Sequence, residues 1–141
     1  MNEPTEIHGG CACRAVRYRI SAPPIITRAC WCRFCQFLGA GSGTVNVCFP
    51  SNAIRIDGAL SDYTSVADSG NRMHRRFCPV CGTPLFSEAE SRPHLIFVRA
   101  GSLDDTELAK PAMTIWVSQA PSWACIHPQL PKVDAQPPPV A

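Results

Sequence analysis

The chain has 141 residues, a formal net charge of +2, and 45% hydrophobic against 17% charged residues. This length suits one domain, and the composition is ordinary for a folded globular protein, which argues against general disorder. Neither a basic and apolar leader nor a run of about 18 apolar residues occurs, so we predict a cytoplasmic protein without a membrane span.

Short strands are predicted along most of the chain. Residues 14–20 (RAVRYRI) and 44–50 (TVNVCFP) alternate between apolar and other side chains, which is typical of half-buried strands. In the second segment the alternation puts Cys48 on the face opposite Val47 and Phe49. Turn residues separate further predicted strands at 54–57, 61–66, 72–77, 94–100 and 113–117.

Only the segment after Cys32, which reads RFCQFLG, is predicted to form a short helix, and Gly39 would end it. Many short strands with few helices indicate a mainly β fold of folded antiparallel sheets. Five of the fourteen residues from 128 to 141 are proline. We therefore predict a domain of residues 1–127 and an extended or disordered tail at 128–141, in which a short packed segment near Leu130 is compatible with the sequence.

The nine cysteines are the strongest chemical signal. In a reducing compartment an odd number of cysteines favours metal binding over disulfides. Cys78 and Cys81 form a C-x-x-C-G turn of the kind that wraps one zinc ion, and Gly82 can adopt the left-handed conformation that such a turn needs. Together with the C-x-C pair Cys11 and Cys13, they predict a closed four-thiolate site that contributes folding energy.

A second set, Cys30, Cys32 and Cys35, has C-x-C-x-x-C spacing and brings three sulfurs within six residues. Three ligands leave one coordination position of zinc for water or substrate, which is the pattern of a reactive site. An iron–sulfur cluster is the alternative metal group for this spacing. A closed, purely structural site is another alternative, and it needs one more ligand from the remaining candidates: Cys48, Cys125, His8, His74, His94 or His127.

Other residues have both functional and ordinary interpretations. Five arginines close to the cysteine segments could offer guanidinium groups to an anionic substrate, although a solvated surface is the favoured interpretation for most of them. These are Arg28, Arg33, Arg72, Arg75 and Arg76. The aromatic residues Trp31, Phe34, Trp116 and Trp123 are predicted to belong mainly to the core, with Trp31 beside the metal.

Several runs in chain order resemble the glutathione-dependent formaldehyde-activating enzyme family, also called the centromere protein V-like family. They are GGCACRAVRYRI, ACWCRFCQ, RRFCPVCGTPLF, VRAGSLDD and IWVSQAPSWA. The resemblance covers about residues 8 to 125 and implies a zinc-stapled fold known as a β-tent. It also implies that Cys11, Cys13, Cys78 and Cys81 hold a structural zinc ion, and that Cys30, Cys32 and Cys35 hold a catalytic one.

Members of this family are described as carbon–sulfur lyases, and the founding activity joins glutathione to formaldehyde as S-hydroxymethylglutathione. Many members have histidine where this chain has Trp31, and this chain is shorter than the founding enzymes. The resemblance therefore implies a zinc-dependent carbon–sulfur lyase or synthase that acts on a thiol adduct of a small aldehyde or related electrophile, with glutathione as a candidate thiol.

A non-enzymatic zinc scaffold that binds a protein partner is the alternative from another functional class. Nucleic-acid binding is not predicted, because seven bound thiolates and two zinc ions bring the net charge to about −1.

Overall fold

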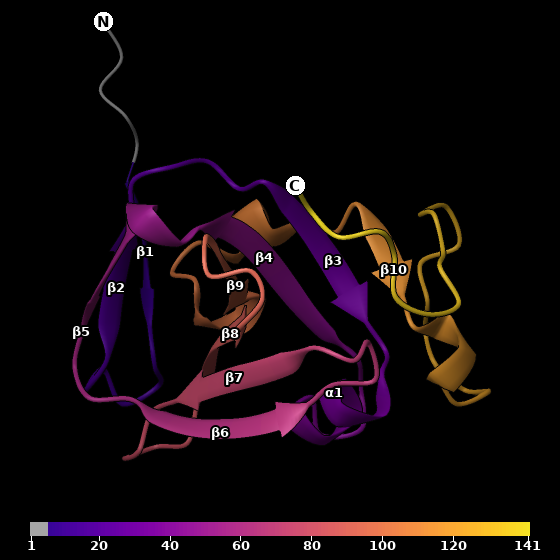
Figure 1. Cartoon of the computed structure of the whole chain (residues 1–141), viewed down its shortest axis with the longest axis horizontal. Coiled ribbons are helices and arrows are strands. Elements are labelled where there is room, and N and C mark those ends of the chain that lie inside the picture. Colours follow the sequence, from indigo (N-terminus) through magenta and orange to yellow (C-terminus); the bar gives the residue numbers. More distant parts are fainter. Residues whose placement is uncertain (1–5) are drawn as a thin grey trace, which may run out of the picture.

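Two β-sheets form the framework of the computed structural model, which describes residues 6–141 (Figure 1). Residues 1–5, the start of the predicted 1–127 domain, lie outside the described part. The smaller sheet has the order β1 (Ile7–Gly10), β2 (Arg17–Ile20), β5 (Ile54–Asp57). The larger sheet has the order β10 (Met113–Ile115), β3 (Ile26–Cys30), β4 (Thr44–Pro50), β9 (Leu95–Arg99), β8 (Pro84–Ala89), β7 (Arg72–Phe77), β6 (Ser61–Val66).

The sheets fold around an interior with a triangular outline, in which the smaller sheet, β3 with β4, and β6 with β7 form the three sides (Figure 1). Neighbouring strands pair antiparallel, except that β10 pairs parallel with β3. The predicted mainly β fold of folded sheets is confirmed. None of the helices within residues 6–141 is long and apolar enough to cross a membrane.

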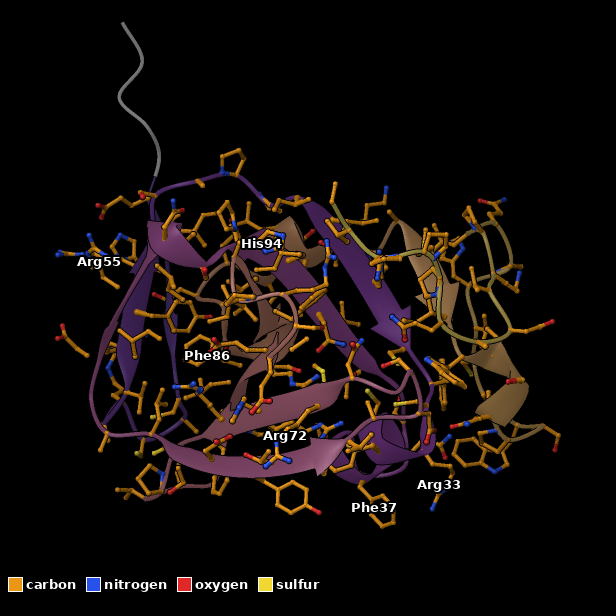
Figure 2. All side chains as sticks on the ribbon, viewed as in Figure 1. Arg33, Phe37, Arg55, Arg72, Phe86 and His94 are labelled. Carbon is orange, nitrogen blue, oxygen red and sulfur yellow. The ribbon has the colours of Figure 1, made fainter. Side chains whose placement is uncertain are left out.

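The alternating pattern of residues 14–20 explains how β2 packs. Val16, Tyr18 and Ile20 are buried, whereas Arg19 between them is exposed. The Tyr18 ring meets Phe86 of β8 edge-on with a centroid distance of 5.2 Å, and Phe86 lies inside the triangular outline (Figure 2). This main core joins the small sheet to the large one.

The predicted strands at 54–57, 61–66 and 72–77 match β5, β6 and β7, and the predicted helix is α1 (Arg33–Leu38), followed by Gly39 as its C-cap. The strand predicted at 113–117 ends at Ile115, because Trp116 adopts a left-handed conformation with φ of 58°. Strands β1, β3 and β8 were not predicted.

The residues from 128 to 141 form no regular element, but part of this segment lies along β10 and adds to the edge of the large sheet. Thr114 and Val133 are joined by a hydrogen bond from the Val133 N–H to the Thr114 carbonyl at 2.9 Å, and the Thr114 N–H donates to Pro131 at 2.9 Å. The Trp116 indole N–H donates to the Gln136 side-chain oxygen at 3.0 Å. Residues 131–136 are therefore tied to β10, which pairs with β3 and places Ile115 opposite Cys30.

Truncation after Leu130 is expected to lower the free energy of unfolding by about 1–3 kcal/mol, because the segment's hydrogen bonds to β10 are lost and buried donors of β10 lose their partners. Urea unfolding measures this change. The matched control is Asp134→Ala, which leaves the backbone bonds in place and should change stability by no more than about 0.5 kcal/mol. Equal stability of the truncated and full chains would contradict the packing seen here.

Candidate metal centres

Cys11, Cys13, Cys78 and Cys81 come together as one group, named here the four-cysteine cluster, with their sulfurs all within 4.8 Å of one another. The Cys11 and Cys13 sulfurs are 3.6 Å apart, and those of Cys13 and Cys78 are 3.8 Å apart. Bonds of about 2.3 Å from zinc to sulfur in a regular tetrahedron place the sulfurs roughly 3.8 Å apart. The donor set and its spacing therefore fit one zinc ion.

Local backbone geometry explains why the C-x-x-C-G segment can hold two sulfurs on one side. Gly82 has a φ of 78°, and its N–H donates to the Cys78 carbonyl at 2.9 Å, which closes the turn. The N–H groups of Val80 and Cys81 point at the Cys78 sulfur at 3.4 and 3.5 Å. A hydrogen bond with Thr83 lowers the pKa of Cys81 to about 5, which favours the thiolate that metal binding requires.

Cys30, Cys32 and Cys35 form the second group, named here the cysteine triplet, with their sulfurs within 4.8 Å. Cys30 ends β3, and Cys32 caps the start of α1 by accepting a hydrogen bond from the Cys35 N–H at 3.3 Å. The turn from strand to helix thus places all three sulfurs on one side. Hydrogen bonds with Cys30 and Cys32 lower the pKa of Cys35 to about 2, whereas hydrogen bonds with Cys32 and Cys35 raise the pKa of Cys30.

Within residues 6–141 no other cysteine, histidine or carboxylate joins the triplet. The buried Cys48 thiol lies elsewhere on the sheet, and Cys125 is exposed. His74 instead contacts Asp62 and Glu90, at 2.7 and 2.9 Å. The triplet is thus a three-sulfur set in this structure, and the metal-ligand roles of both clusters remain predictions.

The two clusters belong to different parts of the interior. Cys11 and Cys78 belong to the main core, which joins the two sheets. Cys30 and Cys35 belong to a small separate group with Ile115, against which Trp116 and Val133 pack. A change at the triplet therefore disturbs less of the fold than one at the four-cysteine cluster.

A cavity of about 300 Å³ opens beside the triplet, and all three cysteines line it. This volume is at the lower end of the range for small-molecule sites. Its walls come from the inner face of the large sheet, from α1, and from Gln136, Pro139 and Val140 near the end of the chain. The segment from 128 to 141, predicted as an extended or disordered tail, thus contributes to the site.

Arginines contribute more to this cavity than the sequence indicated. Arg28 and Arg75 are 7% and 8% exposed, so the surface interpretation is wrong for both, although it holds for Arg33 and Arg72. Arg99 also lines the cavity but was not considered from the sequence. Its signal was an arginine on the same strand face as Leu95 and Phe97 in a predicted strand.

The aromatic residues also differ in part from the core prediction. Trp31 is buried as expected, whereas Trp123 is 69% exposed. Phe34 and Trp116 are half-buried and line the cavity. The Arg75 guanidinium lies 3.7 Å from the centroid of the Phe34 ring, which brings a cation and an aromatic face to the same wall.

Folded sheets with two separate cysteine clusters define a small β protein with two candidate metal centres. The family model described as glutathione-dependent formaldehyde-activating enzyme matches residues 6–119, and the chain therefore belongs to that family.

A Halomonas elongata protein named "Putative glutathione-dependent formaldehyde-activating enzyme" is 25% identical over 130 residues, which cover 86% of this chain and 81% of that protein. The crystal structure of a Rhodobacter sphaeroides protein matches 74% of this chain and 96% of its own with a TM-score of 0.57. At 22% identity that likeness concerns the fold alone.

Proposed function

We propose that the protein is a zinc-dependent carbon–sulfur lyase or synthase that acts on the adduct of a small thiol, such as glutathione, with a small aldehyde or related electrophile. The observation that carries the proposal is the cysteine triplet on the wall of a cavity large enough for a small molecule. Family membership and the name of the Halomonas relative support the choice of thiol and aldehyde. A cytoplasmic location, where glutathione is abundant, is part of the same proposal.

The two clusters have different roles in this proposal. The four-cysteine cluster holds a structural zinc ion that ties the first turn to the C-x-x-C-G turn. Cys30, Cys32 and Cys35 hold a second zinc ion beside the cavity. When bound there, zinc supplies an open coordination position and a positive charge that favour the thiolate form of a substrate thiol.

The chemistry in the synthetic direction is the addition of a thiol to a carbonyl group. The thiol proton leaves, the thiolate sulfur forms a bond with the carbonyl carbon, and the carbonyl electron pair moves to oxygen, which takes up a proton. The lyase direction reverses these steps. Binding of both reactants in the cavity would hold them close together, which lowers the entropic cost of their meeting.

The indole of Trp31 cannot act as the proton-transfer group that a histidine at this position could provide. Its ring packs against Gly43, so tightly that a Cβ at Gly43 would come within 2.9 Å of the indole. We infer that Trp31 shapes the chain next to the cysteines, while protons are exchanged with solvent or substrate.

The proposal predicts that zinc-loaded protein accelerates the equilibration of glutathione and formaldehyde with S-hydroxymethylglutathione. Exchange NMR measures the rate, and an increase of at least about tenfold at micromolar protein is expected. Free zinc ions at the same concentration serve as the control. If zinc-loaded protein and free zinc ions give the same rate of equilibration, glutathione and formaldehyde are not substrates of this protein.

A further inference from the structure

The cavity beside the cysteine triplet is unusually rich in positive charge. Five arginines and one aspartate line it, and three thiolates with one zinc ion would add a single net negative charge, which leaves an excess of three positive charges. The aspartate, Asp68, is exposed and accepts a hydrogen bond from Gln119 at 3.1 Å. Among residues 6–141, the cavity lining thus offers a single carboxylate for five guanidinium groups.

None of these five arginines takes part in the ion pairs found among residues 6–141, and all but the exposed Arg33 are at least half-buried: Arg28, Arg75, Arg92 and Arg99. Buried charges in proteins are normally paired, because an unpaired one loses its hydration without compensation. In the described part of the chain the Nε atoms of Arg28, Arg92 and Arg99 are buried without a hydrogen-bond partner. These guanidinium groups thus retain unused donors.

Strand register places the unused donors next to the triplet. Arg28 lies opposite Asn46 on β4, and Asn46 lies opposite Arg99 on β9, so the three side chains form a row across the inner face. Cys30 follows Arg28 by two positions on β3, which puts the two side chains on one face about 7 Å apart. Asn46 contributes its own oxygen to the Arg99 guanidinium and so fixes its orientation.

Arg75 faces the same space from β7, where it lies opposite Ser87. Its guanidinium is held over Phe34 and donates to Ser65. Planar guanidinium groups bind carboxylates through paired hydrogen bonds, and they do so most strongly where water is excluded. The arrangement is therefore suited to a ligand that carries a carboxylate.

We propose that Arg28, Arg99 and Arg75 form a carboxylate-binding subsite, and that the natural substrate carries a carboxylate within a few bonds of its reacting sulfur or carbonyl group. This inference rests on the proposed function and narrows its substrate class. Neutral small thiols and unsubstituted aldehydes then lack the contact that orients the reactant at the triplet.

The test compares two thiols of equal length, 3-mercaptopropionate and 3-mercaptopropan-1-ol, with propionate as a carboxylate that lacks sulfur. Binding to the metal-loaded protein is followed by isothermal titration calorimetry and by tryptophan fluorescence, to which Trp116 in the cavity wall contributes. In cobalt-substituted protein, the thiolate-to-cobalt absorption band reports separately whether the sulfur reaches the metal.

Wild-type protein is expected to bind 3-mercaptopropionate at least about tenfold more tightly than the neutral thiol. Arg28→Met should abolish this preference, and Arg28→Lys should retain only part of it, because lysine lacks the planar fork. Arg55→Met is the matched control, since Arg55 is exposed on β5 (Figure 2) and is not among the residues that line the cavity. Removing an unpaired buried charge should not impair folding, so Arg28→Met remains testable.

Equal binding of the two thiols by wild-type protein, or equal loss of both in Arg28→Met, would overturn the carboxylate subsite. A different outcome separates the two proposals: if neither thiol alters the cobalt spectrum while propionate still binds in an Arg28-dependent manner, the subsite stands and the proposed function falls. Glyoxylate, an aldehyde with a carboxylate, provides a second arm. Binding of propionate or glyoxylate that depends on Arg28 supports the subsite. If neither compound binds in this way, the subsite is overturned.

Discussion

Cys81→Ala is expected to unfold much of the protein at moderate temperature, although the side chain removed is small and exposed. Binding of structural zinc supplies about 10–16 kcal/mol in small zinc domains, whereas whole domains are stable by only about 5–15 kcal/mol. Loss of one of four ligands should therefore lower the free energy of unfolding by at least about 3 kcal/mol. Thermal unfolding should show a fall in Tm of about 10 °C or more.

The neighbouring residue provides a matched control for this prediction. Val80 is 75% exposed and lies in the same turn, so Val80→Ala removes a similar amount of exposed side chain without removing a sulfur. Its Tm should stay within about 2 °C of wild type. If Cys81→Ala is as stable as Val80→Ala, the four-cysteine cluster does not hold a metal ion that matters for folding.

The second large effect concerns activity. Cys32→Ser is expected to keep the fold but lose the second zinc ion and at least about 99% of the carbon–sulfur activity, because one of the three metal ligands is gone. Serine retains an oxygen that can cap α1 in place of the Cys32 sulfur. The change in Tm should therefore be smaller than about 4 °C, as measured by circular dichroism.

Cys125→Ser is the control for Cys32→Ser, because Cys125 is exposed and lies outside both clusters. It should keep full activity and both zinc ions. Should Cys32→Ser and Cys81→Ala unfold the protein equally, both clusters are structural, and a zinc scaffold that binds a partner becomes the better account.

Strict alternation revealed the strand predicted at residues 14–20, although only its last four residues form β2. In residues 14–20, apolar and charged side chains alternate because one face of β2 packs on the core and the other meets water. β3 and β8 lack this signal, since the inner face of β3 carries Arg28 and Cys30 and that of β8 carries Ser87. Polar residues that face the cavity removed the pattern that would have revealed these strands.

Both cysteine groupings follow from sequence spacing, because short loops bring sulfurs two or three residues apart to the same side. The pairing of Cys11 and Cys13 with Cys78 and Cys81 spans more than sixty residues, and the resemblance to a known family supported that pairing. The arginine row was not predictable in the same way. Arg28 and Arg99 become neighbours of Asn46 only through strand register, which sequence alone does not define.

Zinc content together with X-ray absorption tests most directly whether the two cysteine clusters bind zinc differently. We predict two zinc ions per chain, one bound by four sulfurs and one by three sulfurs and a light atom. Addition of glutathione should change the coordination of the second ion only, from three sulfurs and a light atom to four sulfurs. One zinc ion per chain, or two four-sulfur sites that glutathione leaves unchanged, would contradict the account.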